Sequence, residues 1–199
     1  MIIQTEIITK SPDELLAGLE QKTWYMPALA RMGVKRQREW LAVRVLLKKM
    51  LGTEKQILYT DFGKPYLADA SYRISISHTK KRVAIALAEN NPIAIDIEEI
   101  SPRVENIRSR FMNETEELYL SKIHPLIHSL LHWSAKEAIY KYMDGGDIDF
   151  KSQLHIHPFE PVMGEWKEFT AHETRTKQQQ NFVIRYMVNE DYVLCMINS

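Results

Sequence analysis

We expect an α+β fold with two similar halves facing each other, residues 1–98 and 99–199. Two observations predict this fold. Some stretches place an apolar residue at every third or fourth position, as helices do, whereas shorter stretches alternate apolar and polar residues, as strands do. In addition, both halves contain helical segments followed by several strands.

The elements of the first half follow from local signals. The β-branched residues of segment 1–8 predict a first strand. Ser11-Pro12-Asp13-Glu14 is typical of a helix start, with an N-cap, a proline at N1 and an acidic first turn. A longer helix is expected from about Lys35 to Leu51, with Gly52 as its left-handed C-terminal residue.

The periodicity then changes to that of strands. Between residues 56 and 98 we expect a meander of antiparallel strands that includes Tyr72–Ser77, Val83–Ala88 and Pro92–Glu98. In the second half, helices are expected over about Arg103–Phe111, Asn113–Ser121 and Pro125–Met143, and strands around Leu154–His157, Glu165–Ala171, Phe182–Val188 and Tyr192–Ile197.

Charge and composition exclude several classes of protein. The 26 Lys and Arg residues balance 26 Asp and Glu residues, which disfavours a globally basic nucleic-acid-binding protein. Cys195 is the only cysteine, so no intrachain disulfide can form. The longest apolar run, Val83–Ala88, is far shorter than the ~20 residues that span a bilayer. We therefore expect a cytoplasmic monomer that binds neither nucleic acid nor membrane.

The net charge of zero conceals one basic and one acidic segment of the chain. Residues 31–50 contain seven basic residues and one acidic residue, whereas residues 89–117 contain eight acidic and three basic residues. A polyanionic cosubstrate would favour the first region, and a divalent cation would favour the second.

A pair of carboxylates lies in the acidic region. Alternation along Ile93–Glu98 places Ala94, Asp96 and Glu98 on one strand face, with the two carboxylates about 6.6–7 Å apart. Two such oxygen donors could hold Mg²⁺ and leave room for a phosphate ligand. The alternative is a half-buried strand with a solvated acidic face, which is common in antiparallel sheets.

A second carboxylate site lies on a helix. Glu137 and Lys141 are four residues apart, so they share one helix face. They could supply a third metal ligand and a lysine for a phosphate, or they could form an ordinary helix-stabilising pair. His124, His128 and His132 share a face in the same way, and we favour a solvated or interface face over a zinc site.

Two further segments suit phosphate oxygens. Ser77 and His78 lie at a strand end, and Lys64 lies on a stiff Gly-Lys-Pro turn. The alternative for Lys64 is an ordinary turn lysine. A nucleophilic serine is disfavoured because no Gly-x-Ser-x-Gly elbow is present.

Four motifs occur in one order: Gly63-Lys64-Pro65, Ser75-Ile76-Ser77-His78, Ile95-Asp96-Ile97-Glu98, and Trp133-Ser134-Ala135-Lys136-Glu137 through Lys141. Each is weak alone, but the series resembles the 4′-phosphopantetheinyl transferases, specifically the long single-chain type that activates peptide synthetases and fatty-acid carrier proteins. The resemblance implies a pseudo-two-fold arrangement of the halves, each a small antiparallel sheet packed with a long helix. It also implies an active site for coenzyme A between them.

The resemblance assigns roles to individual residues. The carboxylates of Asp96, Glu98 and Glu137 would bind Mg²⁺. Catalytic residues would be Glu137, Lys141 and Glu116, with Glu137 and then Glu116 as candidates for the general base. Coenzyme A would be contacted by Lys35, Arg36, Arg44, Lys64, Ser77, His78 and Lys141. Ala94 stands where the family usually has glycine, and we expect this departure to be tolerated.

The implied reaction transfers 4′-phosphopantetheine from coenzyme A to a serine of an apo acyl or peptidyl carrier protein. It needs Mg²⁺ and releases adenosine 3′,5′-bisphosphate. One alternative is a non-catalytic module that binds coenzyme A or a carrier protein. Another is a metal-dependent nuclease, which the neutral total charge and the lack of an extended aromatic and basic groove disfavour.

Overall fold

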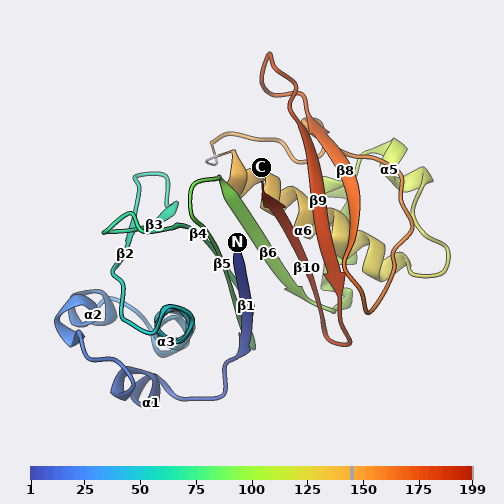
Figure 1. Ribbon diagram of the computed structural model, residues 1–199. Helices are drawn as coiled ribbons and strands as arrows, with labels where there is room; N and C mark the ends of the chain where they lie inside the picture. The colour runs from blue at the N-terminus through green and yellow to red at the C-terminus, as the bar shows by residue number, and fades with distance from the viewer. Residues whose placement is uncertain (144–145, 199) are drawn as a thin grey trace. The chain divides into compact units, whose positions relative to one another are not determined.

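The computed structural model describes residues 1–143 and 146–198 and confirms the α+β class (Figure 1). The chain forms two compact units, Met1–Asn91 and the chain from Pro92 onward. The sequence led us to expect a division after residue 98. The division comes earlier because strand β6 (Ile93–Glu99) pairs antiparallel with β10 (Tyr192–Asn198), near the end of the second unit.

The first unit contains a three-stranded antiparallel sheet in the order β1-β5-β4 and a separate β2–β3 hairpin. Helix α3 packs against β5 and β1. The elements of this unit are β1 (Ile2–Ile7), α1 (Pro12–Ala17), α2 (Lys22–Leu29), α3 (Val34–Leu51), β2 (Ile57–Tyr59), β3 (Pro65–Leu67), β4 (Arg73–His78) and β5 (Arg82–Ala88).

Local signals correctly located the start of α1 and the end of α3. Ser11 caps α1, and its side chain accepts a hydrogen bond from the backbone of Glu14, whose carboxylate bonds back to Ser11. Gly52 ends α3 with a positive φ of 71°. Sequence periodicity missed α2, which contains Pro27. The short strands β2 and β3 lie within the meander of antiparallel strands expected between residues 56 and 98.

The second unit is a five-stranded antiparallel sheet in the order β6-β10-β9-β8-β7. Helix α6 packs against β6 and β10. The remaining elements are a 3₁₀ helix (Pro102–Ile107), α4 (Arg108–Phe111), α5 (Glu114–Leu118), α6 (Pro125–Tyr142), β7 (Leu154–Ile156), β8 (Lys167–Glu173) and β9 (Asn181–Val188). The helix that we predicted over residues 103–111 is therefore divided between a 3₁₀ helix and α4.

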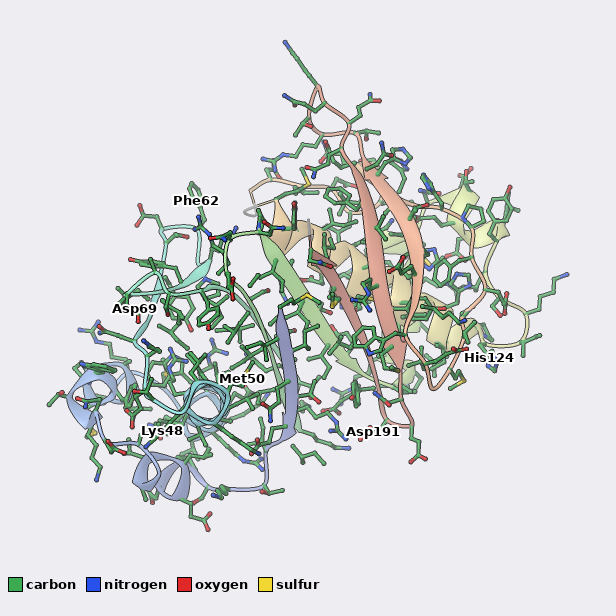
Figure 2. All side chains as sticks on the ribbon, in the orientation of Figure 1. Lys48, Met50, Phe62, Asp69, His124 and Asp191 are labelled. Atoms are coloured by element: carbon green, nitrogen blue, oxygen red, sulfur yellow. The ribbon has the colours of Figure 1, made fainter. Side chains whose placement is uncertain are left out.

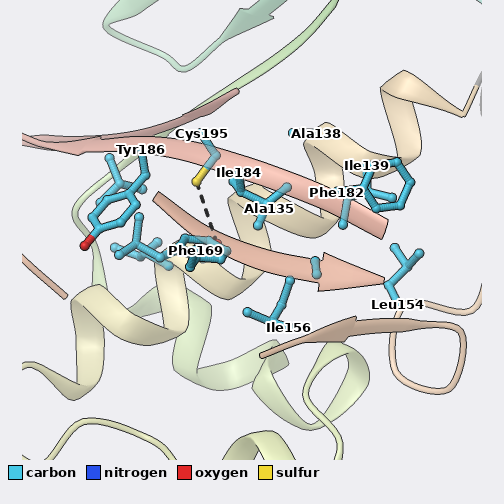
Figure 3. Packing of buried hydrophobic residues seen from close by; sticks show 14 of the residues in the cluster. Ala135, Ala138, Ile139, Leu154, Ile156, Phe169, Phe182, Ile184, Tyr186 and Cys195 are labelled. Carbon is cyan, nitrogen blue, oxygen red and sulfur yellow. Dashed lines mark hydrogen bonds between the residues drawn. The ribbon is translucent and has the colours of Figure 1, made fainter. Parts of the chain in front are cut away.

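The core of the second unit lies between α6 and the sheet. Figure 3 shows Ala135, Ala138 and Ile139 of α6 beside Cys195 and aromatic residues such as Phe169 and Phe182. Small residues on α6 allow the helix to approach the sheet closely. None of the helices within the described ranges has both the length and the hydropathy needed to cross a membrane.

Two histidines lie in this core, contrary to our expectation of a solvated or interface face. His128 is fully buried and His132 is 3% exposed, and both rings contact Phe159. The backbone N–H of Ser121 donates to Nδ1 of His128 over 2.8 Å. Burial lowers the pKa of His128 to about 4 and that of His132 to about 3, so both are neutral at pH 7.

A buried ion pair connects α5 to α6. The Lys136 Nζ atom lies 2.8 Å from an oxygen of Glu116, and it also donates to the carbonyl oxygens of Phe111 and Phe150. Glu116 accepts further hydrogen bonds from the backbone N–H groups of Asn113 and Ile156. Both charged groups thus have the hydrogen bonds that burial requires.

Lys136→Met should lower the free energy of unfolding by about 3–5 kcal/mol, because it leaves the Glu116 carboxylate buried without its cation. Urea denaturation would measure the change. Lys167→Met is the matched control, since Lys167 forms an exposed pair with Glu165 and its loss should cost at most about 0.5 kcal/mol. Equal stability of Lys136→Met and wild type would contradict a stabilising role for the pair.

Candidate functional site

The predicted acidic face of β6 is turned toward helix α6. Asp96 and Glu98 both accept hydrogen bonds from α6 side chains, and Ala94 belongs to the apolar cluster that α6 helps to form. Asp96 is 4% exposed, so this face is not a solvated acidic strand. The Ser134 hydroxyl also donates to the backbone carbonyl of Asp96 over 3.3 Å, which joins the strand and helix at this point.

Lys141 is the cation beside Asp96. Its Nζ atom lies 2.7 Å from Oδ1 of Asp96 and 3.2 Å from the carbonyl oxygen of Ile95. The sequence left open a simple pair between Lys141 and Glu137 on the same helix. The structure instead directs the ammonium group to the strand, where it balances a buried carboxylate.

Glu98 is held by a neutral donor. The indole N–H of Trp133 donates to Oε1 of Glu98 over 2.7 Å. Burial, together with the charges of Asp96 and Glu137, raises the pKa of Glu98 to about 7, although Trp133 and Lys141 act in the opposite direction. The charges of the other two carboxylates, Asp96 and Glu137, therefore both act on Glu98.

Glu137 is the third carboxylate of this cluster. Burial and then the charge of Asp96 raise the pKa of Glu137 to about 7, and Lys141 lowers it only in part. In the described residues, no hydrogen bond reaches the Glu137 carboxylate. A half-buried acid with a raised pKa and no donor of its own is typical of a functional site.

Asp96, Glu98 and Glu137 offer carboxylate oxygens as possible ligands for a metal ion. Carboxylate oxygens are the ligands that Mg²⁺ prefers, and a cation would relieve the repulsion that raises the pKa values of Glu98 and Glu137. However, among the described residues, no group of three His, Cys, Asp or Glu side chains is arranged so that it could hold a metal ion. The donor set therefore fits Mg²⁺ in kind, while Asp96 and Glu98 are engaged by Lys141 and Trp133.

The first unit brings together three of the basic residues that we assigned to coenzyme A. Glu39, which is 8% exposed, lies at their centre. Its carboxylate is 4.0 Å from Nζ of Lys35 and 3.8 Å from both Arg36 and His78, and Arg36 Nη1 lies 2.7 Å from His78 Nε2. Sequence reasoning missed the role of Glu39, although it is the only acidic residue in the basic segment.

Arg44, which we also assigned to coenzyme A, is not among the residues that contact Glu39. It is 3% exposed, and its guanidinium lies 3.3 Å above the ring of Trp40. The guanidinium donates to the Trp40 carbonyl oxygen and to the Tyr59 hydroxyl. Burial lowers the pKa of Arg44, and the aromatic contacts compensate for its lost hydration.

The remaining assigned residues lie on β4 and on the β2–β3 turn. Ser77 is 6% exposed on β4. Lys64 follows Gly63, whose positive φ of 81° the turn requires, and the Lys64 backbone is bonded to Thr60. Phe62, which is 81% exposed, projects from the same turn (Figure 2).

Glu116, the second candidate for a general base, has both oxygens engaged by Lys136 and backbone N–H groups. Such contacts are typical of a carboxylate that stabilises the fold. The signal for this role is present in the sequence, because Asn113 and Glu116 have the spacing of a helix capping box, which the structure contains.

The raised pKa of Glu137 predicts how stability depends on pH. Between its unfolded value of 4.5 and its folded value of about 7, the folded protein binds more protons, so stability falls as the pH rises through this window. Glu137→Gln should therefore stabilise the metal-free protein at pH 8, by at most about 3 kcal/mol, and have little effect at pH 4.5.

Urea unfolding at both pH values in the presence of a chelator would measure this difference. Glu168→Gln is the control, because Glu168 is exposed on β8 and should not change stability at either pH. A gain from Glu137→Gln that is the same at pH 4.5 and pH 8 would contradict the raised pKa.

Comparison with known proteins places these residues in a family. Residues 92–197 match the model of the 4′-phosphopantetheinyl transferase superfamily. The 4′-phosphopantetheinyl transferase AcpT of Salmonella typhimurium strain LT2 is 33% identical over 125 residues, which cover 59% of this chain and 64% of the relative. The proteins of the same name from Escherichia coli O157:H7 and K12 are both 29% identical over 150 residues, covering 72% of this chain and 73% of each relative.

The matched residues contain β6 and α6, and therefore Asp96, Glu98, Trp133, Glu137 and Lys141. The chain spans less than two thirds of the length of the Salmonella relative. The family match covers more than half of the chain and includes the whole buried acidic cluster, so this protein belongs to the 4′-phosphopantetheinyl transferase superfamily.

Proposed function

We propose that this protein transfers the 4′-phosphopantetheine group of coenzyme A to a serine of an apo acyl or peptidyl carrier protein, as the long single-chain transferases do. The reaction would require Mg²⁺ and release adenosine 3′,5′-bisphosphate. One observation carries the proposal: the family match encloses a cluster of three carboxylates and a lysine, and two of these carboxylates have pKa values raised to about 7.

Asp96, Glu98 and Glu137 would hold the metal ion. When bound, Mg²⁺ would neutralise negative charge on the pyrophosphate oxygens and orient them. The protein itself has little covalent work to do, because the nucleophile is the carrier serine. The bond between the serine oxygen and the phosphorus bearing the pantetheine arm forms as the pyrophosphate bond breaks, and the serine proton must pass to a base.

Glu137 is the best candidate for that base. In the described residues no hydrogen-bond donor engages its carboxylate, so an oxygen of Glu137 is available to accept a proton. Glu116 is a weaker candidate, since Lys136 and two backbone N–H groups engage both of its oxygens. Lys141 would steady the leaving phosphate with the ammonium group that now contacts Asp96.

Residues of the first unit would bind the phosphates of coenzyme A. Lys35, Arg36 and His78 surround Glu39, which limits their mutual repulsion and holds their side chains together. Ser77 and Lys64 are proposed to join them because they occupy the family motifs. Arg44 is proposed only as a support for this region, because aromatic rings enclose its guanidinium.

Coenzyme A with Mg²⁺ should increase the mass of an apo carrier protein by one phosphopantetheinyl group. Mass spectrometry of carriers from fatty-acid and peptide-synthetase systems would detect the shift. A sample without Mg²⁺ is the control and should show no product. If folded protein leaves every carrier unmodified but binds coenzyme A, the non-catalytic binding module replaces this proposal.

Asp96→Ala and Glu137→Ala should each reduce the transfer rate at least about 100-fold, since each removes a carboxylate proposed to hold the Mg²⁺ that neutralises charge at the reacting phosphate. The rate would be measured at limiting Mg²⁺, with circular dichroism to verify folding. Glu168→Ala, an exposed carboxylate on β8, should retain the wild-type rate. A near-native rate in either cluster variant would refute the metal assignment.

A further inference from the structure

We infer that Trp133 is a positioning residue for Glu98, and that its indole N–H fixes the Glu98 carboxylate for metal binding. This inference rests on the proposed function, because it concerns one of the proposed Mg²⁺ ligands. Its physical basis is independent of the family match: a short hydrogen bond, an aromatic clamp and the placement of three α6 side chains opposite β6.

The hydrogen bond is short and its acceptor is a carboxylate oxygen. The distance from Nε1 of Trp133 to Oε1 of Glu98 is 2.7 Å. Bonds to an ionised carboxylate are stronger than those between neutral groups. Indole has a single donor and no acceptor, so the contact restricts the orientation of the carboxylate without offering an alternative partner.

Two aromatic rings hold the indole in place. Its centroid lies 5.2 Å from that of Phe111, at an interplanar angle of 58°, and 5.6 Å from that of Phe150, at 40°. Phe111 is fully buried, so one side of the clamp belongs to the core. A donor whose ring is already packed against two aromatic neighbours loses little further entropy when it forms a hydrogen bond.

The position of Trp133 on α6 explains its role. Trp133, Glu137 and Lys141 are spaced four residues apart, so they form one stripe on the helix. One end of the stripe donates to Glu98 and the other end donates to Asp96. Glu137 lies between these donors along the stripe.

The two donors differ in charge, and this difference matters for a cation site. Lys141 balances the charge of Asp96 with a full positive charge, whereas Trp133 orients Glu98 and leaves its negative charge in place. A residue of the hydrophobic core could fill the same space without a donor. The N–H of Trp133 is therefore the feature that packing alone does not explain.

Trp133→Phe tests the inference, because it retains an aromatic ring next to Phe111 and Phe150 and removes the donor. Isothermal titration with Mn²⁺ in the presence of coenzyme A would measure metal affinity directly. We expect the affinity to fall about 10- to 100-fold, as is usual when a hydrogen bond to a metal ligand is lost. Trp166→Phe is the matched control, since Trp166 is 40% exposed and should leave the affinity unchanged.

A double-mutant cycle separates positioning from packing. In a Glu98→Ala background the carboxylate is absent, so Trp133→Phe should cause no further loss of Mn²⁺ affinity. An equal loss in both backgrounds would overturn the inference, as would wild-type affinity in Trp133→Phe. Should Trp133→Phe not fold, Phe150→Leu loosens the clamp and keeps the donor. A reduction in Mn²⁺ affinity that Glu98→Ala abolishes supports the inference, and unchanged affinity refutes it.

The outcomes also distinguish this inference from the proposed function. If wild-type protein neither binds Mn²⁺ nor modifies a carrier, the proposed function fails and the inference fails with it. If wild-type protein modifies carriers and Trp133→Phe binds Mn²⁺ normally, only the positioning role is refuted.

Discussion

The contact between Lys141 and Asp96 is the interaction on which the site depends. Asp96 is 4% exposed, and a carboxylate at that depth needs a close cation and hydrogen bonds to remain charged. Lys141 supplies the cation over 2.7 Å and also bonds the Ile95 carbonyl oxygen, so it ties α6 to the backbone of β6. With helix and strand joined in this way, Trp133 meets Glu98 at the other end of the same helix stripe.

The second unit contains two kinds of buried acid. Glu116 has a lysine and backbone donors for its oxygens, as a stabilising carboxylate should. Glu98 and Glu137 instead have pKa values raised to about 7 because burial and neighbouring negative charges outweigh the contacts that favour ionisation. Such a cluster destabilises the folded chain at neutral pH. A bound cation would remove this penalty.

Local sequence patterns were sufficient for much of the fold. Alternation along β6 predicted that Asp96 and Glu98 share a face, and helical spacing predicted the same for Glu137 and Lys141. Helix ends followed from Ser11 and Gly52, whose conformations depend on residues close by in the chain. Helix α2 escaped prediction because it contains Pro27, which interrupts a helical pattern.

By itself, the sequence determined which residues share a face, since the periods of helix and strand are properties of the local backbone. Only the tertiary structure decided which faces are buried and which partners meet. It placed His128 and His132 in the core and enclosed Arg44 between Trp40 and Tyr59. It also directed Lys141 to Asp96 rather than to its helix neighbour. These outcomes depend on contacts between residues far apart in the chain, which no local period encodes.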